Sequence, residues 1–184
     1  EEEAGDGAKF WRAWTKDELP NLKLPLETAS RDETSFDPDS FVLTIEKETL
    51  ARLNLLAGRW ATTLDVVLLS CWQVLLMRLT GQPEFTIDCL FDGRKFEELQ
   101  EPCGLFASSL PIPGLLRKDE SFSTVVQRVM ESSREAQAWQ EYYFAGSKVT
   151  ENSVAFGYEG RPARRTGRPA PPRGEGAARR LDPQ

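Results

Sequence analysis

The sequence predicts an α/β fold in which long helices pack against a sheet. Stretches with strand-like alternation are separated by stretches with helical spacing of apolar residues, and this order is typical of layered α/β domains. The chain has 184 residues, of which 40% are hydrophobic, so it can bury the core of one domain of ordinary size.

The first half of the chain predicts two helices with an extended stretch between them. Residues 10–19 should form a short helix that Pro20 closes, and an extended connector follows. Residues 40–45 have the β-branched and aromatic content and the alternation of a strand. A second helix should begin near Lys47, because the leucines that follow recur at helical spacing.

The longest apolar stretch, residues 64–79, gives the strongest helix prediction. Apolar side chains surround more than one stripe of this helix, so it should be a buried central helix. Thr62 or Thr63 can cap its start, and Gly81 can end it. The stretch is too short and too polar to span a bilayer, so no membrane span is predicted.

Two strands, a long helix and a last strand complete the predicted body. The strands cover residues 84–91 and 105–112. Ser121 should cap a long amphipathic helix that ends before Tyr142. Residues 154–158 predict the last strand.

The net charge of −6 is divided unevenly along the chain. Residues 161–184 carry seven arginines against one glutamate and one aspartate, a local charge of +5, so residues 1–160 carry −11. Arg, Pro, Gly and Ala dominate this segment, which predicts a disordered tail. A nucleic-acid-binding tail, or a segment translated in a shifted reading frame, would have the same composition. We therefore divide the chain into an acidic segment at 1–9, a body at 10–160 and the tail.

Composition excludes several other classes of protein. Cys71, Cys89 and Cys103 are odd in number and form no CxxC pair, which argues against a disulfide framework and against a zinc site. The acidic N-terminus is unlike a signal peptide. These features predict reduced thiols in a cytoplasmic protein. Nucleic acid is not an expected partner, because an acidic body repels phosphate.

Short motifs follow one another in a specific order along the chain. They are Phe10-Trp11-Arg12, Leu22-Lys23-Leu24-Pro25, the leucine-rich stretch from Thr63 to Gly81, Phe91-Asp92-Gly93-Arg94, Gly104-Leu105-Phe106-Ala107-Ser108-Ser109-Leu110-Pro111 and Trp139-Gln140-Glu141-Tyr142-Tyr143-Phe144. Together they resemble the C-terminal lobe of condensation domains from nonribosomal peptide synthetases, in the chloramphenicol acetyltransferase-like superfamily. The resemblance covers roughly residues 10–160. It implies a single lobe of a two-lobe domain, with a layered chloramphenicol acetyltransferase-like sheet and long helices.

The chain contains no histidine, although the family it resembles depends on one. Histidine is the side chain whose ordinary pKa suits a general base near neutral pH. In the family, the catalytic H-H-x-x-x-D-G motif lies in a preceding N-terminal lobe. The resemblance therefore implies a partial condensation-type acyltransferase domain that forms amide bonds only with that lobe and is inactive alone. The alternative is a noncatalytic binding or scaffold module derived from the same fold.

The resemblance places eight candidate residues in the substrate tunnel or at the lobe interface. They are Asp92, Gly93, Arg94, Gly104, Phe106, Ser108, Ser109 and Gln140. Arg94 resembles the arginine that holds the aspartate of the catalytic motif by a charge-assisted hydrogen bond; otherwise it is an exposed turn arginine. Gly93 resembles a residue near the channel floor, or it gives the backbone freedom after a strand.

The remaining candidates also have structural alternatives. Gly104 and Phe106 are typical of strand entry and core packing. Ser108, which stands where the family has asparagine, and Ser109 can donate hydrogen bonds toward an acyl substrate. Without a base, neither serine is an activated nucleophile. Gln140 contacts the lobe interface, or it is an exposed glutamine at a helix end.

The resemblance also implies the partners. A donor acyl thioester and an acceptor amine would meet in a tunnel, each on the phosphopantetheine arm of a peptidyl carrier protein, so the chain would bind no cofactor directly. The N-terminal lobe would be the other partner. A lobe of this kind should expose apolar surface for it, here around Trp11 and Trp14 and around Phe106 and Leu110.

Overall fold

The computed structural model describes most of the predicted body of the chain. It covers residues 2–14, 22–25, 39–94, 98, 104, 106–143 and 154–160. The predicted tail at 161–184, Cys103 and much of the predicted connector lie outside the described residues.

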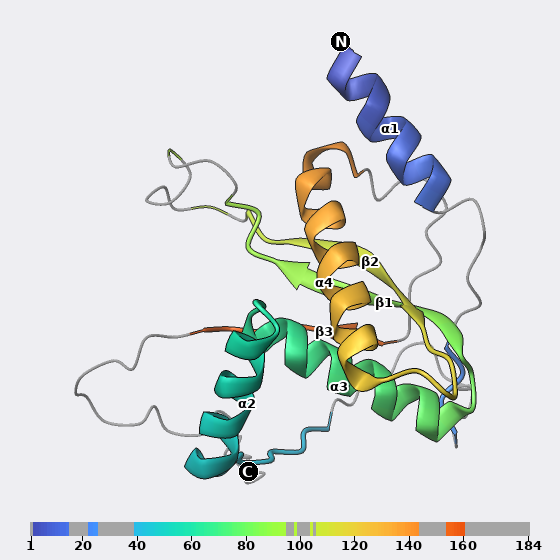
Figure 1. Cartoon of the computed structure of the whole chain (residues 1–184). Helices are drawn as coiled ribbons and strands as arrows, with labels where there is room; N and C mark the ends of the chain where they lie inside the picture. Colours follow the sequence, from blue (N-terminus) through green and yellow to red (C-terminus); the bar gives the residue numbers. More distant parts are fainter. Residues whose placement is uncertain are drawn as a thin grey trace, which may run out of the picture.

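A three-stranded sheet with helices packed on it forms the centre of the structure (Figure 1). The strand order is β2-β1-β3, with β1 at Glu84–Phe91, β2 at Ser108–Leu115 and β3 at Ala155–Phe156. β1 pairs antiparallel with β2 along its whole length and parallel with β3 at two positions. The arrangement confirms the predicted α/β fold.

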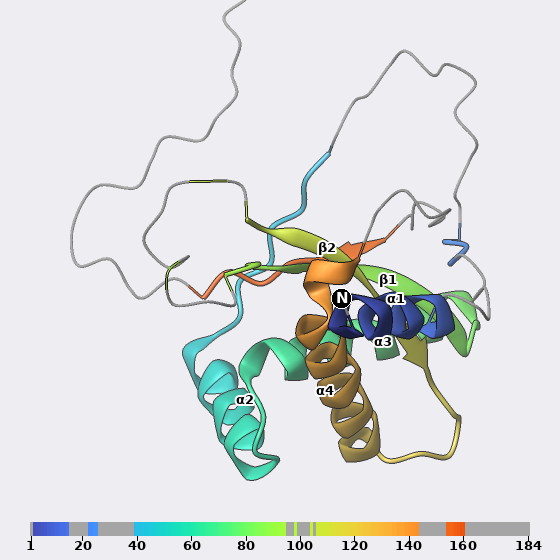
Figure 2. The ribbon, with the colours of Figure 1, turned by 90° about the horizontal axis from the view of Figure 1, so that it is seen from above.

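One face of the sheet is covered by helices. α4, at Phe122–Ala138, packs against β2 and against α3, at Leu64–Thr80. Along β1, Phe85 and Ile87 are fully buried whereas Leu90 is 54% exposed. Seen from above, α1 and α4 lie on the same side of the sheet (Figure 2). The core therefore lies between this face of the sheet and the helices, as the period-two burial of β1 requires.

α3 follows its predicted bounds, but it is not buried on all sides. Gly81 ends the helix with a φ of 72° and donates its amide to the carbonyl of Met77 at 2.8 Å, and Thr63 lies at the N-cap without a side-chain hydrogen bond. The outer stripe of the helix is exposed at Cys71, Leu75 and Leu79. The prediction of a buried central helix is wrong for this stripe, because none of the described elements covers it.

α2, at Lys47–Arg59, begins where the sequence predicts. It reaches α3 through a sharp bend of 103°. No single helix in the described part of the chain is long and apolar enough to cross a membrane, and α2 and α3 reach that length and composition only as this bent pair.

α4 begins at the predicted cap and is fixed to the end of β2. The Ser121 hydroxyl accepts a hydrogen bond from the Thr124 amide at 3.2 Å. Arg128 donates to the carbonyl of Leu115 and pairs with Glu120 at 2.5 Å. The hydrogen bond from Arg128 lowers the pKa of the Glu120 carboxyl. These contacts join the strand, the turn and the helix into one unit.

Residues 40–45 do not form the predicted strand. Phe41, Val42 and Leu43 are 89%, 85% and 79% exposed, and none of the strands in the described part of the chain pairs with them. β-propensity reports how well side chains fit a pleated surface, and it does not supply the neighbouring strand that a ladder needs. The other predicted strands exist with shifted ends, since β2 begins at Ser108 and β3 has only two residues.

The N-terminal helix, α1, spans Glu2–Trp14 and thus begins well before residue 10. Phe10, Trp11 and Trp14 pack with Trp139 and Tyr143 in an aromatic cluster whose ring centroids lie 4.7 to 6.0 Å apart. The indole of Trp11 donates to the carbonyl of Trp139 at 2.7 Å. These contacts hold α1 against the end of α4.

The apolar surface expected for a partner is therefore not where the sequence predicts it. Trp11 is 5% exposed and Leu110 is fully buried, and Trp14 and Phe106 are partly buried. The Trp14 indole donates to the carbonyl of Pro111 at 3.1 Å. Both indole N–H groups thus find carbonyl partners inside the chain, so this face can turn inward without leaving an unpaired indole donor.

Gly7 gives a direct test of the α1 contact. A Cβ at Gly7 would overlap the Cβ and ring of Tyr142, whereas a Cβ at Gly5 would meet nothing within 4 Å. We expect Gly7→Ala to lower the free energy of unfolding by about 1 to 3 kcal/mol, the usual cost of overpacking. Gly5→Ala should be neutral or stabilising, because alanine favours the helix. Thermal unfolding of both variants measures the difference, and equal melting temperatures would contradict the packing of α1 on Tyr142.

The cysteines give a second test of the fold. Burial, with a smaller effect of Asp88, raises the pKa of the Cys89 thiol to about 12. Cys71 lies on the exposed stripe of α3, where partial burial also raises the pKa of its thiol but leaves the side chain accessible to the reagent. Because the thiolate is the reactive form, iodoacetamide at pH 8 should alkylate Cys71 in the folded chain and Cys89 only after unfolding. Peptide mass spectrometry separates the two sites, and early alkylation of Cys89 would show that β1 is not covered.

Candidate lobe-interface site

The structure brings together the candidates that lie where β1 ends and β2 begins. Phe91, the last residue of β1, pairs with Ser108, the first residue of β2. Asp92, Gly93 and Arg94 leave β1 at this point, and Phe106 lies just before β2. We call this group the hairpin-end site; it comprises Asp92, Gly93, Arg94, Gly104, Phe106, Ser108 and Ser109.

The two glycines of the hairpin-end site allow close packing against Phe106. Gly93 has a φ of 72°, and a Cβ on it would overlap the carbonyl oxygen of Phe106. A Cβ at Gly104 would lie 2.8 Å from the Phe106 ring. Gly93 thus has the backbone role proposed from the sequence, because a side chain there would be both strained and obstructed.

Arg94 is held by two neighbours within the chain. Its guanidinium carbon lies 4.5 Å from the centroid of the Phe106 ring, and its Nε lies 3.5 Å from Oδ1 of Asp92. The Arg94 side chain is 20% exposed, whereas that of Asp92 is 75% exposed. Arg94 is therefore not a free turn arginine. A guanidinium that stacks on a ring keeps its edge for hydrogen bonds, and its five donors can serve more than one acceptor.

The two serines differ in their surroundings. Ser109 is exposed and pairs with Leu90. The hydroxyl oxygen of Ser108 is buried and has no hydrogen-bond partner within the described ranges. A buried hydroxyl without a partner costs free energy, so this atom is suited to a group that comes from outside the described structure. The chain has no histidine to act as the base that would make either serine a nucleophile.

Gln140 lies apart from the hairpin-end site and is buried. It is the first residue of η2, Gln140–Tyr142, which packs against α1, and it is 8% exposed. The alternative of an exposed glutamine at a helix end is therefore wrong. Its side-chain oxygen has no partner in the described part of the chain. The burial comes from the contact between η2 and α1, which no local sequence pattern predicts.

A cleft of about 200 Å³ adjoins the hairpin-end site. Asp92 and Leu90 line it on one side, and three other elements complete it. Its further lining residues include Asp65 of α3, Ser133 and Gln137 of α4, and Phe156 and Tyr158 in and after β3. Apart from Asp92, the sequence reasoning missed these residues, because they meet only in the folded chain. Among the described residues, no group of three His, Cys, Asp or Glu side chains could hold a metal ion.

Known proteins match this chain over most of its length. Residues 1–146 match the family model of the condensation domain. Tyrocidine synthase 3 from Brevibacillus parabrevis is 29% identical over 136 residues, which are 74% of this chain and 2% of that protein. Bacitracin synthase 1 from Bacillus licheniformis is 28% identical over 136 residues, which are 74% of this chain and 3% of that protein.

Solved structures share the fold. The first condensation domain of the calcium-dependent antibiotic synthetase, in complex with substrate analogue 2a, has a TM-score of 0.66 at 18% identity and covers 84% of this chain and 36% of its own. The X-domain from teicoplanin biosynthesis has a TM-score of 0.66 at 24% identity and covers 74% of this chain and 30% of its own. This chain thus spans about a third of these structures. It belongs to the condensation-domain family of nonribosomal peptide synthetases and represents part of such a domain.

Proposed function

We propose that this chain forms the C-terminal lobe of an amide-forming condensation domain and that its hairpin-end site faces the other lobe. The observation that carries the proposal is the placement of Arg94, which Phe106 and Asp92 hold at the end of the sheet. A guanidinium fixed in this way is suited to receive a carboxylate from a second lobe. The buried Ser108 hydroxyl lies close by in the chain, at the start of β2, and is suited to a further polar group.

In the proposed reaction, the amine nitrogen of the acceptor attacks the thioester carbon of the donor. A carbon–nitrogen bond forms, the carbon–sulfur bond breaks, and the thiol of the donor's phosphopantetheine arm leaves. The amine proton passes to a base that this histidine-free chain does not supply. Arg94 acts as a positioning residue that orients the other lobe. Positioning of two substrates can lower the activation barrier by about 7 to 11 kcal/mol, so a lobe without a base can still affect the rate.

The proposed partners are an N-terminal lobe with the H-H-x-x-x-D-G motif and two peptidyl carrier proteins. The carriers present their substrates on phosphopantetheine arms, and the chain itself binds no cofactor directly. The cytoplasm is the proposed location, since that is where these partners would load their substrates.

A noncatalytic module remains the second candidate because the chain has no histidine of its own. Such a module would use its acidic body, with a charge of −11 over residues 1–160, to bind a partner. It would bind a carrier or another lobe without promoting any bond formation.

The test combines the full chain with an N-terminal condensation lobe that carries the histidine motif, together with loaded donor and acceptor carriers. Amide product that depends on both lobes and disappears when the histidines of the motif are replaced supports the proposal. Binding of the lobe without any product, under conditions in which an intact condensation domain is active, supports the noncatalytic module.

A further inference from the structure

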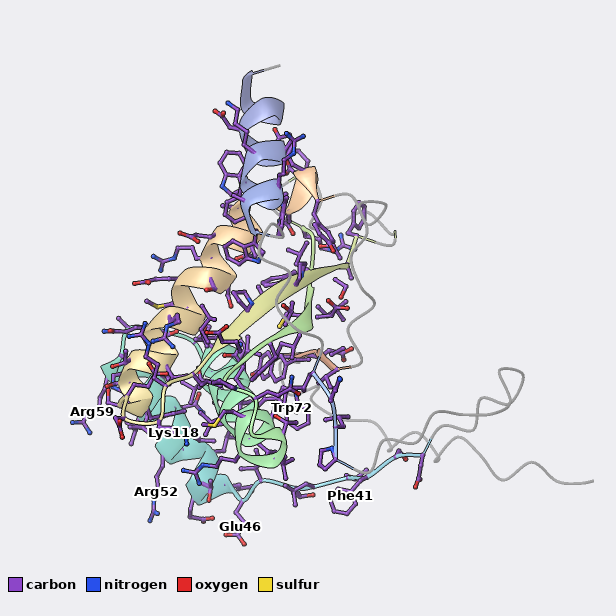
Figure 3. The ribbon with its side chains drawn as sticks, turned by 90° about the vertical axis from the view of Figure 1, so that its right-hand side faces the viewer. Phe41, Glu46, Arg52, Arg59, Trp72 and Lys118 are labelled. Carbon is purple, nitrogen blue, oxygen red and sulfur yellow. The ribbon has the colours of Figure 1, made fainter. Side chains whose placement is uncertain are left out.

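Residues 41–45 form an extended stretch that the described structure leaves uncovered. Phe41 is 89% exposed, Val42 85%, Leu43 79% and Ile45 42%. None of the backbone hydrogen bonds among the described residues involves this stretch. Figure 3 shows Phe41 outside the body of helices and sheet, on the chain that leads into α2 at Glu46.

The side-chain pattern fits a strand that is covered on both faces. In an extended chain, Phe41, Leu43 and Ile45 point to one side, and Val42 and Thr44 point to the other. An exposed edge strand usually carries charged residues or proline, which prevent association with other chains. This stretch has neither, and monomeric proteins seldom expose apolar side chains in such a continuous run.

The family comparison indicates what kind of partner covers it. The solved condensation domain that covers 84% of this chain is matched over only 36% of its own length, so most of that domain has no counterpart here. That unmatched part of the domain is large enough to supply the strand that residues 41–45 lack among the described residues. Asp39 and Glu46 flank the stretch and are both exposed, so a complementary strand would carry basic residues near its ends.

We infer that residues 41–45 are a docking strand that pairs with a β-strand from the part of a condensation domain that this chain lacks. The partner strand adds main-chain hydrogen bonds along the stretch, and its apolar side chains lie beside those of Phe41, Leu43 and Ile45 on the same face of the joined sheet. This inference rests on the proposed function, because it names the surface through which the lobe joins the rest of its domain.

The test uses the full 184-residue chain, co-expressed with the first condensation domain of the calcium-dependent antibiotic synthetase from which the matching segment has been removed. Hydrogen exchange is measured by mass spectrometry with and without this partner. Alternate amides within residues 42–45, those that face the partner strand, should exchange at least about 10-fold more slowly in the complex, because paired amides open rarely. Exchange in the unbound chain should be fast throughout the stretch.

Two proline variants, Val42→Pro and Leu43→Pro, test the pairing itself. Adjacent amides in a strand point to opposite edges, so at least one of the two variants must remove an amide that faces the partner. That variant should weaken capture of the partner by about 10-fold or more, while the melting temperature of the unbound chain stays unchanged. Leu55→Lys is the matched control: Leu55 is 69% exposed on α2, and its replacement should leave capture unchanged.

Four results would overturn the inference. They are failure of the wild-type chain to capture the partner, capture without protection of residues 42–45, full capture by both proline variants, and protection of these amides in the unbound monomer. A homodimer that protects the stretch would instead assign it to a second copy of the chain. If the complex forms amide product while the amides of residues 42–45 stay unprotected, this inference is wrong and the proposed function stands. If these amides are protected but the complex forms no amide product, the proposed function is wrong and this inference stands.

Discussion

Gly93→Ala is expected to destabilise the chain more than Gly104→Ala, the same change at the other glycine of the hairpin-end site. The residue has a φ of 72°, and the added Cβ would overlap the Phe106 carbonyl oxygen, which is backbone and cannot rotate away. Left-handed strain and overpacking together should cost about 2 to 4 kcal/mol. Urea unfolding monitored by circular dichroism measures this loss.

Gly81→Ala separates the cost of a left-handed backbone from the cost of overpacking. Gly81 has the same φ of 72°, but an added Cβ would meet nothing within 4 Å. Its replacement should therefore cost only about 1 kcal/mol, the usual penalty for a side chain in a conformation that favours glycine. Equal losses for the two variants would show that Gly93 does not pack against Phe106 and would remove the basis for placing Arg94.

Arg94→Ala is expected to reduce amide formation by the assembled lobes about 10- to 100-fold. A hydrogen bond to a charged group is worth about 1.5 to 3 kcal/mol, which corresponds to that change in rate. Because Arg94 positions the other lobe and does not hold the substrates, the loss should appear in kcat more than in KM. Arg94→Lys should recover only part of the rate, since lysine neither stacks on Phe106 nor forms a planar fork.

Arg59→Ala is the control for the loss of a positive charge. Arg59 is exposed at the end of α2 and points outward in Figure 3. The assembled lobes should form amide at the same rate with or without it. A rate that falls equally in both variants would mean that overall charge matters, and the positioning role of Arg94 would then be wrong.

Elements with strong local signals could be predicted from the sequence. Gly81 and the apolar run before it define α3, and Ser121 defines the start of α4. β1 follows from its sequence because Phe85, Ile87 and Cys89 recur at every second position, and all three are buried in the structure. In each case, neighbouring residues in the chain carry the information.

Features that depend on distant contacts could not be predicted. Trp11 packs against the ring of Tyr143 and donates to the carbonyl of Trp139, both far along the chain, and the sequence shows only an apolar helix face without its partner. Gln140 is buried because η2 packs against α1, although its side-chain oxygen has no partner among the described residues. Residues 41–45 show the opposite error: the local pattern is that of a strand, but pairing requires a neighbour that the described structure does not contain.

The candidate site was predicted in part. Motif order led to Arg94, Phe106 and Gly93, which the structure brings together. The motif order did not reveal that Arg94 pairs with Asp92 inside the chain, because the backbone conformation at Gly93 decides whether these two side chains come close. Asp65 and Ser133, which line the adjoining cleft, belong to different helices and meet only in the folded chain.

The most direct test of the central claim is single-turnover amide formation by the purified chain alone, with loaded donor and acceptor carriers and a buffer control. We predict no product above the control, because the chain has no histidine to accept the amine proton. Product should appear when the N-terminal lobe with the histidine motif is added. Turnover by the chain alone that persists after contaminating enzymes are excluded would contradict the account.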